Sequence, residues 1–190
     1  MSKDKKDEKD SIGKLEELFL KSRTIMLYGE INQKVAREFC TKLQLLASES
    51  DDDITVYINS PGGHVESGDS IHDMIRFVSP RVKVVGTGWV ASAGALIYAA
   101  PPVEDRFSLP NTRYMLHQPS GGVGGQASDI NIEADQIVKM RERLNQIFAD
   151  QTGQPIDRIS KDTNRNFWMT PTDAKEYGLV GKIINTHDEL

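Results

Sequence analysis

The stretch "RVKVVGTGWVASAGALIYAA", residues 81–100, decides the fold class of this chain. It begins as a Val-rich run typical of a buried strand, passes through small residues, and continues as an apolar run typical of a helix. The stretches "RTIMLYGEI" (23–31) and "ITVYINS" (54–60) are similar strands, and each precedes a segment with helical spacing of apolar residues. Strands that alternate with helices predict parallel βαβ units, so we expect an α/β fold.

The segment 121–152 separates two further predicted strands, 113–118 and 181–185. It begins with a glycine-rich lead-in, and apolar residues then recur at steps of three, four and seven. This pattern predicts a helix from Ser128 to Asp150, about 35 Å long. The helix is either an ordinary core helix or an arm that reaches another subunit. The first 14 residues are highly charged, so we expect a mobile tail at 1–14 and a single domain at 15–190.

Composition argues against several classes of function. The 190 residues are 38% hydrophobic and carry a net charge of -5 with both signs interspersed, which does not favour binding to nucleic acid or to a membrane. Cys40 is the only cysteine, so we expect no disulfide or thiolate metal site and assign it to core packing. Without a long apolar run or a signal-like N-terminus, the sequence predicts a cytoplasmic protein. The final "HDEL" is therefore interpreted as coincidence.

Ser92 is the first candidate for chemistry because it lies where the predicted strand meets the predicted helix. Serine is a favoured helix N-cap, which is one interpretation of this position. The alternative is a nucleophile at a turn that exposes the hydroxyl and directs backbone N–H groups to the same point. The G-x-S-x-G pattern of many hydrolases is not met, because Val90 replaces the first glycine.

Two other short stretches carry groups that a serine nucleophile needs. In "NSPGGHVESG" (59–68) the amides of Gly62 and Gly63 are unobstructed donors, although a plain turn explains the glycines as well. In "YMLHQPSGG" (114–122), His117 ends a strand, where open α/β sheets place their sites, and it is a candidate base. His64 and His72 are its rivals. No histidine pair has the spacing of a zinc site, so we expect no metal.

Taken together, four stretches resemble the family of Clp protease proteolytic subunits (ClpP) from about Leu20 to Thr186. They are "INSPGGHVESGDSIHDMIRFV", "GWVASAGALIYAA", "LPNTRYMLHQPSGGVGGQASDI" and "TPTDAKEYGLVGKII". The resemblance implies a crotonase-like fold of repeated βαβ units and a serine endopeptidase that cleaves unfolded polypeptide inside two stacked heptameric rings. It also implies that the long helix is a handle that joins the rings, within a region of about 121–152.

The same resemblance assigns roles to individual residues. It implies that Ser92 is the nucleophile, that His117 is the general base, and that the amides of Gly63 and Ala93 form the oxyanion hole. Substrate would lie beside Gly121, Gly122, Val123, Gly124 and Gly125. An AAA+ unfoldase of the ClpX, ClpA or ClpC type would use ATP and dock on Tyr57, Phe77, Phe107, Leu109 and Ile184; no cofactor is implied for this chain.

The sequence departs from the family pattern at three places. The family's third catalytic residue is an Asp in "D-T-x-R-D", whereas this chain reads "DTNRN" and has Asn166 there. An amide can orient the imidazole but supplies no charge, and Asp162 matches a structural family residue. The tail is more charged than in the family, and Thr55 and Thr87 replace larger apolar docking residues.

These departures leave three functions open. The leading hypothesis is an active serine endopeptidase that uses Ser92, His117 and Asn166. The second is a catalytically weak or regulatory paralogue that acts in mixed rings with an active subunit. The third is an acyl-CoA-processing enzyme of the crotonase type, which shares the fold and the paired backbone donors but needs no serine nucleophile.

Overall fold

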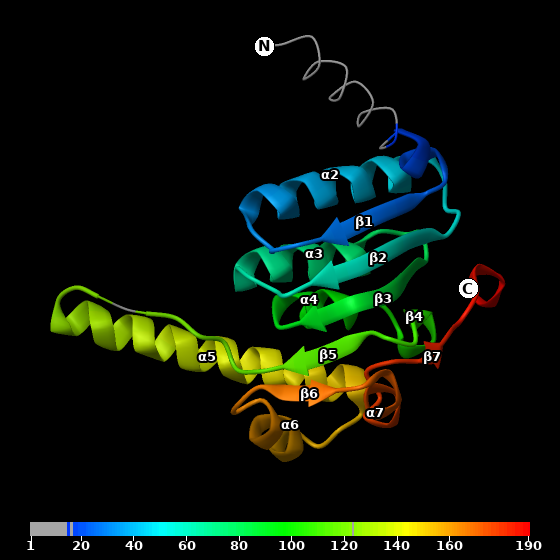
Figure 1. Ribbon diagram of the computed structural model, residues 1–190. Coiled ribbons are helices and arrows are strands. Elements are labelled where there is room, and N and C mark those ends of the chain that lie inside the picture. Colours follow the sequence, from blue (N-terminus) through cyan, green and yellow to red (C-terminus); the bar gives the residue numbers. More distant parts are fainter. Residues whose placement is uncertain (1–14, 16, 123) are drawn as a thin grey trace, which may run out of the picture.

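The computed structural model describes residues 15, 17–122 and 124–190 (Figure 1). The predicted tail at 1–14 and Val123 lie outside these residues. The described chain contains a sheet whose strands are β1 (Thr24–Tyr28), β2 (Ile54–Ser60), β3 (Val82–Ala91), β4 (Arg106–Ser108), β5 (Arg113–Leu116), β6 (Phe167–Met169) and β7 (Lys182–Ile183). The strands run in the order β1-β2-β3-β4-β7, with β5 paired to β3 and β6 paired to β5. The predicted α/β fold is confirmed.

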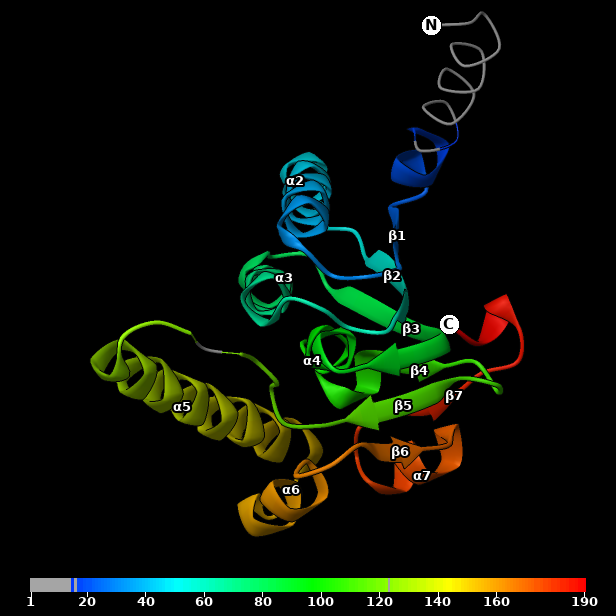
Figure 2. The same cartoon turned by 60° about the vertical axis from the view of Figure 1, so that its left-hand side comes forward.

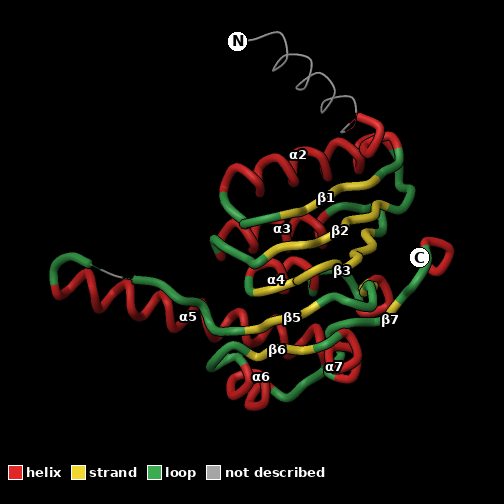
Figure 3. Tube along the Cα trace, viewed as in Figure 1, coloured by secondary structure: helices red, strands yellow, loops and turns green. Residues whose placement is uncertain are grey.

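Helices cover one face of this sheet. Figure 2 shows α2, α3 and α4 side by side against β1, β2 and β3, and the tube in Figure 3 shows the alternation of strand and helix along the chain. The helices are α2 (Gln33–Glu49), α3 (Val65–Phe77), α4 (Ala93–Tyr98), α5 (Ala127–Thr152), α6 (Ile156–Asp162) and α7 (Pro171–Glu176), with short 3-10 turns at Val103–Asp105 and His187–Glu189. None of these described helices is long and apolar enough to cross a membrane.

Local sequence explains why these elements form. In α2, the Asn32 side chain accepts a hydrogen bond from the Val35 amide at 3.0 Å and so begins the helix. Residues at three- and four-residue steps then face the core. In β2, side chains alternate, so Ile54, Val56 and Ile58 are buried against the helices and the residues between them face the other side of the sheet. Cys40 on α2 is half-buried and packs against this core.

Strand β3 branches, and this branching positions the site. Its first half pairs with β4 and its second half with β5, in parallel. Strand β6 pairs with β5 in the antiparallel direction. The sequence did not predict β4 or β6, because a three-residue strand is too short to show a hydrophobic period. The parallel pairing predicted for the strand–helix repeats holds for β1, β2 and β3, and the antiparallel β6 is an addition to it.

Helix α5 extends far beyond the body of the molecule (Figures 1 and 2). Only the part near its C-terminal end is buried, through Leu144, Asn145, Phe148 and Ala149. The ordinary core helix is thus the wrong interpretation, because Ile130, Ile132 and Val138 on the distal part are exposed. With 26 residues at 1.5 Å each, the helix is about 39 Å long.

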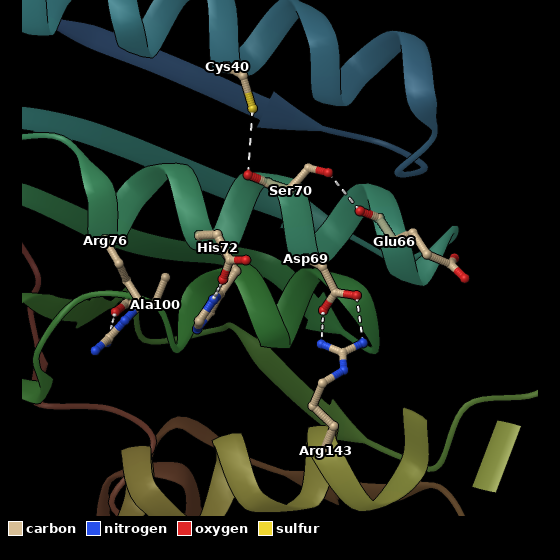
Figure 4. A network of polar contacts seen from close by, with 9 residues as sticks. Cys40, Glu66, Asp69, Ser70, His72, Arg76, Ala100 and Arg143 are labelled. Atoms are coloured by element: carbon tan, nitrogen blue, oxygen red, sulfur yellow. Dashed lines mark hydrogen bonds and ion pairs between the residues drawn. The ribbon is translucent and has the colours of Figure 1, made fainter. Parts of the chain in front are cut away.

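Two arginines attach the base of α5 to the body. Arg143 on α5 makes a bidentate ion pair with Asp69 on α3, with both N···O distances at 2.7 Å (Figure 4). Arg106 on β4 is almost fully buried and donates hydrogen bonds to the carbonyl oxygens of Pro101 and Gln151, at 2.7 and 2.8 Å. Burial lowers the pKa of Arg106 to about 10, well above neutral pH, so it anchors the helix as a cation.

Candidate active site

The structure brings Ser92 and His117 into direct contact. The Nε2 atom of His117 lies 2.7 Å from Oγ of Ser92. The two residues meet because each follows the carboxyl end of one of two neighbouring parallel strands, β3 and β5, whose residues Ala91 and Met115 are paired. The main-chain amide of Ser92 extends this pairing by donating to the Met115 carbonyl at 2.9 Å. A serine and an imidazole in hydrogen-bonding contact are the core of a nucleophilic site.

The backbone at Ser92 argues against the helix-cap interpretation. Ser92 precedes α4, but its side chain makes no capping hydrogen bond. Its φ of 55° and ψ of -123° are rare for a residue with a side chain. This strained turn between strand and helix exposes the hydroxyl, as in nucleophile elbows, even though Val90 breaks the usual glycine pattern.

The Ser60–Gly63 turn packs directly against Ser92. A Cβ atom on Gly62 would lie 2.5 Å from the Cβ of Ser92 and 2.9 Å from the Ala93 nitrogen, and Gly62 has a φ of +95°. A Cβ atom on Gly63 would lie 2.2 Å from the carbonyl oxygen of Ile31. Only glycine fits at either position. The two glycines therefore do more than form a turn, because they allow the chain to pack closely against Ser92 and Ile31.

The two predicted oxyanion donors, the amides of Gly63 and Ala93, lie on the two segments that meet at this junction. Ile31 forms a parallel bridge with Gly63, in which Ile31 donates to the Gly62 carbonyl and His64 donates to the Ile31 carbonyl. In a parallel bridge, the N–H group of the central residue faces away from its partner, so the Gly63 amide is directed elsewhere. The Ala93 amide begins α4 and belongs to the first turn, whose N–H groups have no partner in the helix. Both amides are suited to stabilising an oxyanion.

Asn166 lies beside His117 because of the antiparallel pairing of β5 and β6. Leu116 is paired with Phe167. Because the pairing is antiparallel, His117, which follows Leu116, lies opposite Asn166, which precedes Phe167. Gln118 strengthens this arrangement, since its amide donates to the Thr163 carbonyl at 2.6 Å and its side chain to the Asn164 carbonyl at 2.8 Å. Sequence analysis did not single out Gln118, because its role depends on contacts 46 residues away.

Two opposing effects set the pKa of His117. Burial in the site lowers the pKa below 6.5, and the hydrogen bond from the ring to the Asn166 side chain raises it in part. The net shift is downward. A neutral imidazole can accept the proton of Ser92, so His117 is ready to act as a base near neutral pH.

The rival histidines have other roles. His64 caps α3, because its Nδ1 accepts from the Ser67 amide at 3.3 Å and contacts the Ser67 hydroxyl at 2.9 Å. His72 is buried on α3, and its Nδ1 lies 3.0 Å from the Asp73 carboxylate (Figure 4). Asp162 accepts a hydrogen bond from the Tyr177 hydroxyl at 2.9 Å, which agrees with a structural role.

A cavity of about 300 Å³ lies between the Gly63–Glu66 stretch, the Pro119–Gly121 stretch and α5. Its lining includes Gly63 from the Ser60–Gly63 turn, Gly121 from the glycine-rich segment, and the apolar side chains of Ile137 and Met140 on α5. Gly122, Gly124 and Gly125 are exposed, with Gly122 and Gly124 in open space, while Val123 is outside the described residues. The lining also includes His64, Glu66, Glu133 and Gln136, so the recess combines apolar and polar side chains beside Gly63.

Four of the five predicted docking residues form one cluster on the side of the sheet opposite the helices. Tyr57, Phe107, Leu109 and Ile184 pack together with Val85, and we call these five residues the apical patch. Phe77 is not part of it. It lies at the end of α3 with 77% of its surface exposed.

Within the described residues, no group of three or more His, Cys, Asp or Glu side chains is placed to hold a metal ion. The groups that the structure brings together are the Ser92 hydroxyl and the His117 imidazole, beside the predicted pair of amides. Such a set performs acyl transfer without a metal. The fold and this set of groups define the class as a serine peptidase on an α/β scaffold.

Comparisons with known proteins identify the family. The family model described as Clp protease matches residues 6–187. The ATP-dependent Clp protease proteolytic subunit 3 of Rhizobium johnstonii is 60% identical over 170 residues, which cover 90% of this chain and 88% of that protein. Subunit 2 of Pseudomonas aeruginosa is 54% identical over 185 residues, or 97% and 92% of the two chains. The chain belongs to the Clp protease family.

Solved structures agree with this assignment. ClpP1 from Listeria monocytogenes has a TM-score of 0.85 and 55% identity, and the match covers 93% of this chain and 99% of that one. An asparagine-to-aspartate mutant of the same Listeria protein gives a TM-score of 0.86. The chain is a ClpP serine peptidase, the proteolytic subunit of an ATP-dependent Clp protease, and this decides against the acyl-CoA-processing alternative.

Proposed function

We propose that this subunit cleaves unfolded polypeptides by acyl transfer from the peptide to Ser92. The observation that carries the proposal is the 2.7 Å contact between Ser92 Oγ and His117 Nε2. Ser92 attacks the peptide carbonyl while His117 takes its proton, and the resulting oxyanion is held by the Gly63 and Ala93 amides. His117 then gives the proton to the leaving amine, and water hydrolyses the acyl-enzyme by the reverse roles.

The glycine-rich segment and the recess beside Gly63 support a place for substrate. We assign the extended peptide to Gly121, Gly122, Val123, Gly124 and Gly125, with one side chain in the recess that Ile137 and Met140 line. Exposed glycine backbone offers donors and acceptors to a passing strand without steric hindrance.

A fluorophosphonate probe tests the nucleophile. Such probes react with an activated serine, so we expect labelling at Ser92 and its loss in the Ser92→Ala variant. The Ser48→Ala variant is a matched control, because Ser48 is an exposed serine on α2. Intact wild-type protein that stays unlabelled, both alone and with any second ClpP, contradicts the proposal.

A specific observation favours a second candidate, a subunit of low intrinsic activity that acts in mixed rings. Asn166 contacts the His117 ring but carries no charge to stabilise the imidazolium that forms during attack. In a chymotrypsin-type protease, the Asp-to-Asn exchange at this position lowers kcat about 10⁴-fold. The active and the weak subunit differ only in how well an oriented amide substitutes for a carboxylate.

The Asn166→Asp variant separates these two candidates. If the native subunit is weak, the added carboxylate raises peptidase kcat strongly, by a factor of ten to about 10⁴. If the native subunit is fully active, its turnover is robust and the variant gains little. Asn164→Asp adds the same charge two residues away, so it controls for a general electrostatic effect.

The assembly is part of the same proposal. We assign the handle α5 to contacts between two stacked heptameric rings, either of this chain alone or mixed with a second ClpP, in the cytoplasm. The apical patch, together with Phe77, is assigned to an AAA+ Clp unfoldase, with Thr55 and Thr87 weakening the contact. Native mass and co-sedimentation with such an ATPase test these assignments.

A further inference from the structure

A segment of the chain itself already lies on the apical patch. Leu190 packs against the cluster of Val85, Phe107 and Ile184 beside Tyr57 and Leu109. It reaches this position through a 3-10 turn, His187–Glu189, that follows directly after β7 and its neighbour Ile184. Leu190, the last residue of the segment Thr186–Leu190, therefore packs on the same cluster as the residues assigned to docking, and its side chain is half-buried.

Polar contacts hold this segment in a defined conformation. The Glu189 carboxylate accepts hydrogen bonds from the Asn185 and Thr186 amides at 2.9 and 3.1 Å, which closes a capping box. These bonds lower the pKa of Glu189, so it is ionised at neutral pH. The turn therefore has a defined conformation, because hydrogen bonds join Glu189 at its end to the amides of Asn185 and Thr186 at its start.

Two lysines connect the segment to the sheet. Lys83 on β3 donates to the Leu190 carbonyl oxygen at 3.3 Å and also pairs with Asp53 at 2.9 Å. Lys182 on β7 donates to the Glu189 carbonyl oxygen at 2.8 Å. The apolar contact of Leu190 and these hydrogen bonds act together, so the segment is placed by side chains from several strands.

The segment covers only part of this surface. A cavity of about 630 Å³ remains beside it, and its lining includes Met26, Tyr57, Lys83 and Leu190. His187 and Asp188 are exposed, so the outer side of the turn makes few contacts. A thin, half-exposed turn on an apolar surface can be displaced by a ligand that buries the same surface more completely.

We infer that the segment Thr186–Leu190 is a self-docked cover of the apical patch, which an incoming Clp ATPase must displace. This inference rests on the proposed docking function of the patch. Leu190 occupies apolar surface that the partner needs, so the two compete for it. The cover lowers the apparent affinity for the ATPase, since only the fraction of subunits with an open patch is competent to bind.

The test compares Leu190→Ala with Leu190→Met and Asp188→Asn in the full chain. Leu190→Ala removes most of the apolar contact, so we expect ATPase binding to tighten about three- to tenfold. ATP-dependent degradation of an unfolded protein rises with it, while hydrolysis of a short peptide by the subunit alone stays unchanged. Leu190→Met keeps the apolar contact and Asp188→Asn changes only an exposed side chain, so both behave as wild type.

A second readout needs no partner. The apolar dye anilinonaphthalene sulfonate binds exposed hydrophobic surface, so its fluorescence should rise with Leu190→Ala and with Glu189→Gln, which removes the carboxylate of the capping box. Circular dichroism establishes that both variants remain folded. Dye binding equal to wild type in both variants overturns the cover.

The outcomes distinguish the cover from the docking proposal. If wild type binds the ATPase and Leu190→Ala binds it equally or less tightly, the inference is overturned and the docking proposal stands. If neither protein binds any Clp ATPase, the docking proposal fails and the competition is overturned with it. Tighter binding together with increased dye fluorescence supports the inference.

Discussion

The junction around Ser92 and the distal part of α5 differ in how completely this one chain determines them. At the junction, a Cβ atom on Gly62 or Gly63 would collide with neighbouring backbone or with Ser92 itself. Along the distal helix, Ile132 and Val138 are 57% and 53% exposed. Ser92 is thus fixed by contacts within the subunit, whereas the distal part of α5 presents apolar side chains to solvent, where the proposed assembly would cover them.

This difference predicts which substitutions act within one subunit and which act through assembly. Changes at the junction should reduce catalysis without altering how subunits associate. Changes on the distal handle should alter association first and catalysis only as a result.

Gly62→Ala should have the largest effect. The added Cβ lies 2.5 Å from the Cβ of Ser92, and the backbone is at a φ of +95°, so the elbow must shift. We expect peptidase kcat/KM to fall more than about 100-fold, because small misplacements of reacting groups cost that much. Gly29→Ala is the matched control, since it has a φ of +86° but open space around it. If kcat/KM falls equally in both variants, backbone strain alone explains the loss, and the contact with Ser92 does not contribute.

Ile132→Asp should separate the handle from the junction. Ile132 is exposed, so a charge there leaves the isolated subunit folded but disfavours apolar contact with another subunit. We expect the native mass to fall to that of a smaller assembly and peptidase activity to fall about tenfold. Asn131→Asp places the same charge on the neighbouring residue. A wild-type mass for Ile132→Asp would refute a role of this face in assembly.

The pH profile tests the junction more finely. Because burial lowers the pKa of His117, the acidic limb of kcat/KM should have its midpoint below pH 6.5. Activity is present when His117 is neutral, so it is retained above this midpoint and lost as the pH falls through it. Asn166→Asp stabilises the imidazolium and should move the limb to higher pH. A limb that moves to lower pH contradicts the contact between the two side chains.

Arg143→Gln should have the smallest effect. Its pair with Asp69 is partly exposed, so we expect the free energy of unfolding to fall by about 0.5 kcal/mol in chemical denaturation. Lys139→Gln removes an exposed cation of the same helix and is the comparison. Because the buried Arg106 also anchors the base of the helix, peptidase activity should remain near that of wild type. A large loss of activity would mean that the ion pair positions the active site.

Sequence could predict the features that depend on short-range patterns. The strands β1, β2 and β3, helix α2, the long helix and the positions of Ser92 and His117 all follow from hydrophobic period or from turn residues. Features that depend on distant contacts were missed. Strand β6 is three residues long and exists through its pairing with β5, and Leu190 reaches Val85 and Phe107 only after the chain has folded.

Asn166 stands at the exposed edge of the site, on a different segment from the Ser–His pair. It is not one of the residues that form the elbow, the glycine turn or the paired strands β5 and β6. Under the proposed mechanism, this one side chain sets the catalytic rate separately from the fold. Under the same proposal, two subunits of one architecture differ in catalytic rate through this position alone.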